Sequence, residues 1–224
     1  MELQLETIKI QIQPNDNNLC YAKKYDELTG GKDINDEHIL MLIKEIRLKQ
    51  GWCCKYCEGR DFRLVKDKLK KVAERKKVDK PFEKEFTRYF FCQICHTKNR
   101  PTSSTYLANT RNRLSKWIKL IEKNPTTAAG IMNLINVESA TAYRLNIILN
   151  KVQHIYRDCD VKKYDEKCNE LSALYDVCAS IDAKVSNVFL NAIKACKYKK
   201  LEKLLELFLS VQKVFDPLDA NQSC

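Results

Sequence analysis

Cys54-Lys55-Tyr56-Cys57 is, together with a second pair, Cys92-Gln93-Ile94-Cys95, the most informative feature of this 224-residue chain. Two cysteines with this spacing on a tight turn can direct both sulfurs at one metal ion, and a second such turn completes a tetrahedron. We therefore expect Cys54, Cys57, Cys92 and Cys95 to bind a structural Zn²⁺ ion. Thiolates also suit iron–sulfur centres, but four cysteines on two tight turns more often hold zinc.

Two neighbouring residues leave the ligand set open, because Cys53 adjoins Cys54 and His96 adjoins Cys95. Only Cys54 makes the two-residue spacing with Cys57, so we expect Cys53 to be a free or packed thiol. We expect His96 to be a surface residue, since the second pair already supplies its half of the tetrahedron. Residues 58–91 exceed the spacing of ordinary zinc fingers and ribbons, so this segment must hold structure of its own.

The composition is typical of a protein with a hydrophobic core. At 224 residues and 44% apolar content, the chain is long enough for one large or two small domains. No apolar run approaches the roughly 20 residues that a membrane span needs, and residues 1–6 are acidic where a signal peptide would be basic. We expect an intracellular protein whose eleven cysteines stay reduced, four of them on the metal.

Positive charge is concentrated in one part of the chain. Residues 51–125 carry 20 Lys and Arg against 8 Asp and Glu, whereas residues 1–50 and 126–224 have net charges of −2 and +1. Such a focus of charge is the footprint of a polyanion such as nucleic acid. A solvated lysine-rich helix without a partner is the alternative. The residues expected to contact nucleic acid are Arg63, Lys66, Lys70, Lys71, Lys77, Lys98, Arg100, Arg111, Arg113 and Lys116.

The segment before the first cysteine pair predicts a strand and a helix. Residues 1–13 alternate as a β-strand does, residues 14–18 read as a turn, and Gly30-Gly31 marks a second break. A helix capped by Asn35 or Asp36 follows. Its expected apolar face consists of Ile39, Leu42, Ile43 and Ile46. His38, in the first turn, is expected at the surface or in the core rather than in a catalytic site.

Between the cysteine pairs, residues 62–77 predict a helix with a narrow apolar stripe and a broad basic face. Residues 86–91 predict a strand that delivers Cys92 to the metal. A strand that enters a cysteine turn favours a zinc-ribbon-like module with a helical insertion. The aromatic residues at its end, Tyr89, Phe90 and Phe91, could stack on bases, although a mini-core is the commoner role for such residues.

Helices are predicted throughout the chain beyond the second pair. A polar, basic loop over 96–105 leads into a helix over 106–123, and further helices start at Asn124 or Thr126 and at Ser139. The helix from Ser139 is expected to bury Tyr143, Ile147, Ile148, Val152 and Ile155, and the next one Tyr164, Cys168, Leu171, Tyr175 and Cys178. Two more apolar faces follow, over 185–196 and 201–215. Short connections between such helices predict an antiparallel bundle, with Cys168 and Cys178 in its core.

The last helix is unusually rich in leucine. Leu207 and Leu209 widen its apolar surface, so it is either buried centrally or docked on another chain. The fold class expected is mainly α, with a small zinc-held β/α module. Three parts are expected: residues 1–50 pack on the zinc module, 51–105 form this four-cysteine module, and 106–224 form the bundle with a short disordered tail.

No enzymatic motif is recognisable. The chain lacks a glycine-rich phosphate loop, His-Glu-x-x-His and Gly-x-Ser-x-Gly, so we expect no enzyme. The leading hypothesis is a nuclear, nucleic-acid-binding zinc protein that acts in gene expression, as a transcription factor or an RNA-associated factor, with helices that contact proteins. The alternative is a protein–protein adaptor whose zinc is purely structural. A RING-type ligase would need eight ligands, and this region offers six.

Overall fold

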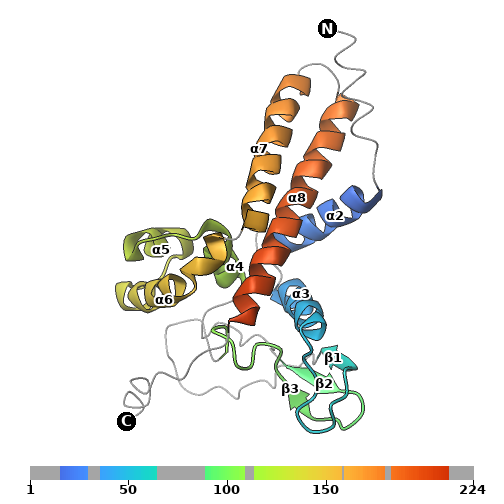
Figure 1. The fold of residues 1–224 in the computed structure, drawn as a ribbon, viewed down its shortest axis with the longest axis vertical. Helices are drawn as coiled ribbons and strands as arrows, with labels where there is room; N and C mark the ends of the chain where they lie inside the picture. Colours follow the sequence, from blue (N-terminus) through green and yellow to red (C-terminus); the bar gives the residue numbers. More distant parts are fainter. Residues whose placement is uncertain are drawn as a thin grey trace, which may run out of the picture.

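The computed structural model describes residues 16–29, 36–64, 89–108, 114–157, 159–179 and 183–211, which form a mostly helical protein with a small sheet (Figure 1). The helices are α2 (Asp16–Thr29), α3 (Asp36–Lys49), α4 (Leu114–Lys123), α5 (Ala128–Ile135), α6 (Ser139–Lys151), α7 (Cys159–Cys178) and α8 (Ala183–Ser210), with a short 3₁₀ helix η1 (Gln153–Arg157). The strands β1 (Phe62–Leu64), β2 (Phe90–Cys92) and β3 (Lys98–Asn99) form one antiparallel sheet in the order β1-β2-β3.

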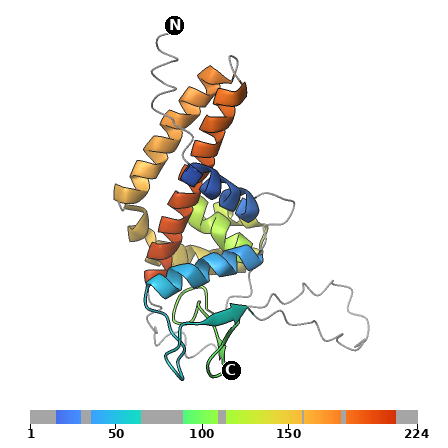
Figure 2. The ribbon, with the colours of Figure 1, turned by 90° about the vertical axis from the view of Figure 1, so that its right-hand side faces the viewer.

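Helix α8 is the axis of the helical part. Its 28 residues carry the apolar face predicted over 185–196 and the next face as far as Leu209 on one continuous helix. Helix α7 runs antiparallel beside it, while α2, α3 and α4 also pack against it (Figures 1 and 2). Leu209 is buried and Leu207 is half-buried among these neighbours. The leucine-rich end of α8 is therefore packed within this chain.

One continuous core joins the helices to the sheet. The Phe208 ring lies 5.8 Å from the ring of Trp117 and 6.4 Å from that of Tyr106. Toward the sheet, Trp52 stacks on Phe62 with 4.1 Å between ring centroids. Phe62 and Phe90 belong to the same buried cluster as the α8 leucines. The inner face of the sheet is thus held by the helical part as well as by the cysteine turns.

Several predicted elements are confirmed. Helix α3 begins at Asp36 and buries Ile39, Ile43 and Ile46, and α6 begins at Ser139 as expected. Both Cys168 and Cys178 are buried on α7, next to α8. The strand over 1–13, the break at Gly30-Gly31 and the tail over 216–224 lie outside the described residues.

The prediction of a turn over residues 14–18 is wrong for Asp16–Asn18, which form the first turn of α2. Asp and Asn favour both turns and helix starts, so composition alone does not separate the two. Packing decides, because Ala22 is buried and Tyr21 stacks on Tyr198 of α8 with 5.6 Å between ring centroids. A helix of modest amphipathicity is stabilised here by its tertiary contacts.

Two predicted helix boundaries are also wrong. Phe62–Leu64 form β1 rather than the start of a helix, because they pair with β2; residues 65–77 are outside the described ranges. The helix predicted over 106–123 begins at Leu114 in the described residues, whereas 106–108 lie in turns. Thr105 explains the turn: its hydroxyl donates to the carbonyl of Thr102 (2.7 Å) and accepts from the N–H of Leu107 (3.2 Å), which competes with helix formation.

The apolar face predicted for the helix that starts at Ser139 is correct only beyond the end of α6, at its C-cap Val152 and at Ile155 of η1. Val152 and Ile155 are buried, but Tyr143 and Ile147 are 62% and 42% exposed. Ala142, Leu145 and Leu149 are buried in their place. The sequence contains two overlapping apolar stripes, and the packing of α6 on α5 selects one of them. Helix α5 starts at Ala128, two residues after Thr126 and four after Asn124, with Thr127 as its N-cap accepting from the N–H of Gly130.

Arg47 of α3 connects the module that contains the cysteine pairs to the end of α8. Its Nε donates to the carbonyl of Pro101 (3.1 Å) and its Nη1 to the carbonyl of Leu209 (3.4 Å). We expect Arg47→Met to lower the free energy of unfolding by about 2 kcal/mol, because Met keeps the apolar stem but leaves half-buried carbonyls without their charged donor. Chemical denaturation measures this loss.

Lys49→Met on the same helix is the matched control. Lys49 forms an exposed ion pair with Glu202 at 3.2 Å, so its removal should cost less than about 1 kcal/mol. Equal losses of unfolding free energy in the two variants would show that the contacts of Arg47 stabilise the protein no more than the exposed ion pair of Lys49 does.

Candidate metal centre and sheet surface

The two cysteine pairs lie on equivalent turns. The N–H of Cys54 donates to the carbonyl of Gly59 (2.9 Å), as that of Cys92 does to Thr97 (3.0 Å). The carbonyls of Cys54 and Cys92 each accept from the N–H four residues later, at 2.9 Å. Glu58 and His96, which directly follow the pairs, both have positive φ, 59° and 55°. The same local backbone therefore presents both pairs of sulfurs.

The four sulfurs converge within 4.8 Å of one another. The Sγ atoms of Cys54 and Cys95 are 3.5 Å apart, and those of Cys57 and Cys92 are 3.4 Å apart. These separations are far longer than a disulfide bond of about 2.05 Å. They approach the separation of about 3.8 Å that four thiolates adopt in a tetrahedron with metal–sulfur bonds of about 2.3 Å. The cluster is compatible with a metal site.

Cys53 and His96 lie outside this cluster. Cys53 is half-buried, and His96 is exposed at the end of the second turn. Among the described residues, the four converging cysteines are the only group of His, Cys, Asp or Glu side chains placed to hold a metal ion.

Two polar side chains beside the sulfurs were not foreseen from the sequence. The Thr97 hydroxyl lies 3.0 Å from Cys95 Sγ and 3.3 Å from Cys54 Sγ. The buried Asn99 donates from Nδ2 to Cys54 Sγ (3.5 Å) and to the carbonyl of Thr97 (3.0 Å), while its Oδ1 accepts from the N–H of Lys55 (3.4 Å). Asn99 therefore ties one cysteine turn to the other. The feature of the sequence that could have identified Thr97 and Asn99 is their position, two and four residues after Cys95.

These contacts change the acidity of the thiols unequally. Burial raises the pKa of Cys54, but hydrogen bonds from Thr97 and from the backbone at Tyr56 and Cys57 outweigh it and lower the pKa to about 5. Hydrogen bonds from Thr97 also lower the pKa of Cys95. The backbone at Gly59 lowers the pKa of Cys57, but the Cys92 thiol and burial raise it by more, to about 12. Four thiolates this close repel one another, and a bound cation would offset that repulsion.

The outer face of the sheet gathers basic and aromatic side chains. Arg63 pairs with Phe91 across β1 and β2, and Phe91 pairs with Lys98 across β2 and β3. Directly paired residues project from the same face, so these three form one cross-strand row. Lys98 Nζ lies 6.0 Å from the Phe91 ring centroid and 5.6 Å from that of Tyr89. The Arg100 guanidinium lies 4.3 Å from the Tyr89 ring centroid and also donates to the Tyr89 hydroxyl.

We call Arg63, Tyr89, Phe91, Lys98 and Arg100 the outer sheet face. Arg63 and Lys98 are exposed, whereas Tyr89, Phe91 and Arg100 are half-buried. On the opposite side, Phe62 and Phe90 are buried against the helices. The aromatic cluster at 89–91 therefore has two roles: Phe90 belongs to the core, and its two neighbours do not.

The structure brings together three of the ten residues expected to contact nucleic acid, namely Arg63, Lys98 and Arg100. Lys116 lies on a different element, α4, and is half-buried. The remaining six lie outside the described residues: Lys66, Lys70, Lys71, Lys77, Arg111 and Arg113.

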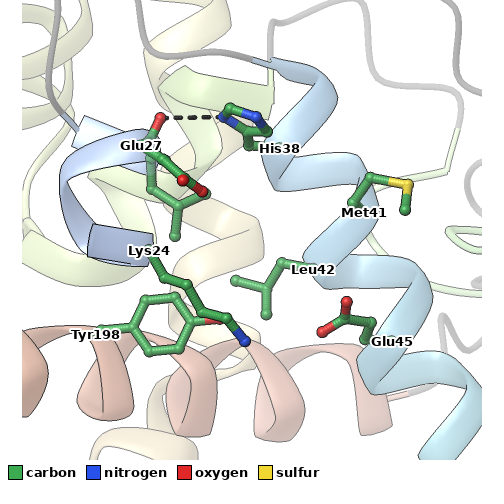
Figure 3. A pocket seen from close by; sticks show the side chains of 8 residues that line it. Lys24, Glu27, His38, Met41, Leu42, Glu45 and Tyr198 are labelled. Carbon is green, nitrogen blue, oxygen red and sulfur yellow. Dashed lines mark hydrogen bonds between the residues drawn. The ribbon is translucent and has the colours of Figure 1, made fainter. Parts of the chain in front are cut away.

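A small open pocket lies between α2, α3 and α8 and holds about 110 Å³ (Figure 3). Figure 3 shows Lys24, Glu45 and Tyr198 around its lower part and His38 beside Glu27 at its upper edge. The His38 Nδ1 lies 3.3 Å from the backbone carbonyl of Glu27, which links the start of α3 to α2. His38 is exposed, which is one of the two locations expected for it.

Comparisons with known proteins identify no relative. No family model matches the chain, and neither the curated proteins nor the solved structures contain a match. Among the described residues, no helix has both the length and the apolar character needed to cross a membrane. The geometry of the cysteine cluster and the outer sheet face is thus the basis for a functional proposal.

Proposed function

We propose that this chain is a nucleic-acid-binding zinc protein that acts in gene expression in the nucleus. In this proposal the four cysteines hold Zn²⁺ in a zinc-ribbon-like module, and the outer sheet face binds the sugar–phosphate backbone. The observation that carries the proposal is the row of Arg63, Phe91 and Lys98 across the three strands.

The choice of zinc rests on the ligand chemistry. Four thiolates on two tight turns suit a tetrahedral ion without redox chemistry, and such closed sites are structural. Zinc would hold the loop after Cys57 next to the loop after Cys95, and so align β1 with β2. The sheet has only two or three residues per strand, too few to be stable alone.

The choice of nucleic acid rests on charge. Between residues 89 and 108 the chain has no acidic residue, and Lys98 and Arg100 both lie on the outer sheet face. With Arg63, three cations share a surface that has aromatic rings but no carboxylate of β1, β2 or β3. A phosphate backbone offers charges at a spacing that such a row can follow, and each contact releases condensed counterions.

The test is a salt titration with full-length, zinc-loaded protein and labelled DNA and RNA. We expect Arg63→Gln/Lys98→Gln to weaken binding about tenfold at low salt, and to reduce the slope of log affinity against log salt by about 0.7 to 0.9 for each lost phosphate contact. Sequence preference should stay unchanged, because lysine contacts to phosphate position a strand without reading it.

Lys184→Gln is the control for the loss of charge. Lys184 is exposed in the first turn of α8, at the end of that helix farthest from the sheet (Figure 1). Its replacement should leave affinity and salt slope unchanged. If the wild-type protein binds neither DNA nor RNA at moderate salt, the proposal is wrong.

The adaptor function is the second candidate, and one observation favours it. Tyr143 and Ile147 are four residues apart on α6 and both exposed, which gives the α5–α6 pair an apolar outer stripe. The leucine-rich end of α8 does not support it, because those leucines pack within the chain. Failure of the titration above would make α6 the surface to examine.

A further inference from the structure

We infer that the outer sheet face binds unpaired bases, so that the ligand is single-stranded RNA or DNA rather than a duplex. This inference rests on the proposed function and specifies its substrate. It depends on the two aromatic rings of the outer sheet face, Tyr89 and Phe91, and on the cations that flank them.

Tyr89 and Phe91 lie on the side of the sheet that faces away from the core. Strand β2 alternates, with Phe90 and Cys92 buried and Phe91 facing outward. Phe62 and Phe90 already supply the apolar contacts to Trp52 and the helices. Among the described residues, the rings of Tyr89 and Phe91 are not part of the core cluster, which is unusual for large rings, since burial is what stabilises them. A ligand with a flat apolar face would cover them.

The surrounding cations match the two parts of a nucleotide. Arg63 and Lys98 flank Phe91 on the neighbouring strands, so a base stacked on Phe91 would have a cation on either side for its phosphates. Arg100 lies over the ring of Tyr89 and offers its own guanidinium plane, on which a second base can stack. Alternating cations and rings are the arrangement that single-strand binding surfaces use.

A duplex fits this surface less well. In a duplex the flat faces of the bases are stacked inside, and only their edges and the backbone are accessible. A major groove admits one helix or a two-stranded ribbon, whereas the outer sheet face spans three strands about 4.8 Å apart. Duplex DNA could contact the cations but would leave Phe91 unused.

The test compares single-stranded RNA, single-stranded DNA and duplex DNA of equal length, bound to full-length, zinc-loaded protein. We expect single strands to bind more tightly than the duplex, and Phe91→Leu to weaken single-strand binding about tenfold with an unchanged salt slope. Phe91→Tyr keeps an aromatic ring and should restore binding. The ranking of the two single strands would distinguish RNA from DNA as the ligand.

Tyr56→Leu is the matched control. Tyr56 is 64% exposed in the first cysteine turn, and Lys55 Nζ lies 4.7 Å from its ring centroid, so it has the same chemistry outside the outer sheet face. Its replacement should leave single-strand affinity unchanged. Zinc content, measured for each variant, shows whether the module is still folded.

A measurement on the wild-type protein makes the test independent of the variants. Ultraviolet crosslinking of a bound oligouridine should label the tryptic peptide that contains residues 89–98. Crosslinks confined to other peptides, or equal affinity of duplex and single strand with no effect of Phe91→Leu, would overturn this inference and leave the proposed function standing. Absence of binding to all three probes would overturn both.

Discussion

Cys54→Ser is expected to abolish stoichiometric metal binding and to unfold the module that the cysteines hold. Cys54 is fully buried, and its sulfur contacts Cys95, Thr97 and Asn99. A serine hydroxyl is a poor ligand for a soft site, and zinc binding contributes an apparent free energy of about 10–16 kcal/mol to folding in small zinc modules. Metal content per chain should fall from one to near zero after dialysis.

We expect loss of the metal to destabilise the sheet before the helices. The three strands are short, and without the cysteine turns a few contacts hold them to the helices, among them the burial of Phe62 and Phe90 and the hydrogen bond from Lys44 Nζ of α3 to the carbonyl of Phe62 (2.8 Å). We expect amide hydrogen exchange to accelerate over residues 52–64 and 89–100, while α7 and α8 stay protected, because these helices pack mainly on each other and on α2. Nucleic-acid affinity should fall together with metal content.

Cys53→Ser is the control for this variant. It alters the adjacent thiol, which is half-buried and outside the cluster, and should leave metal content and exchange rates unchanged. A Cys54→Ser protein that retains one tightly bound zinc and full protection of the sheet would contradict the assigned ligand set. A loss of metal in Cys53→Ser would instead move one ligand to Cys53.

Phe208→Ala is expected to lower the free energy of unfolding by about 3–5 kcal/mol. The Phe208 side chain is 0% exposed and fills the space between α8, Trp117 of α4 and Tyr106 after the sheet. Its removal therefore leaves a cavity where three separate segments meet. Since natural domains unfold with only about 5–15 kcal/mol, this variant should lose much of its stability. Chemical denaturation followed by tryptophan fluorescence measures the loss, and Trp117 reports from the cavity itself.

Val177→Ala on α7 is the control for Phe208→Ala. Val177 is 62% exposed, so its truncation should change stability by no more than about 0.5 kcal/mol. A loss below about 1 kcal/mol for Phe208→Ala would mean that the site collapses around the cavity, and that α8 is not held by this contact.

Strongly local signals were read correctly from the sequence. Helix α3 begins at Asp36, and α7 buries both cysteines, since repeated three-and-four spacing over several turns permits one packing face. Helix α6 shows the limit of this signal. Tyr143, Ile147 and Ile148 compete with Ala142, Leu145 and Leu149 for the buried side, and the position of α5 decides between them.

Elements that depend on distant partners were predictable only in part: a strand before Cys92 was expected, and β2 spans Phe90–Cys92, but its partner strand β1 was not. Residues 62–64 are basic and apolar in a helical pattern, yet they form β1 because β2 is available to pair with them. The leucines at 204–209 indicate a buried helix, but whether another chain or this one covers them depends on where α3 and α4 lie.

The candidate metal ligands and the region of positive charge can both be identified from the order of the amino acids. The spacing within each cysteine pair is a property of one tight turn, so four residues are enough to orient two sulfurs. In contrast, the strand pairing in the folded chain is needed to place Arg63, Phe91 and Lys98 in one row and Phe90 on the other side of the sheet. The physical reason is strand register: a shift of one residue would reverse the faces, and register is set by pairing between segments that are far apart in the chain.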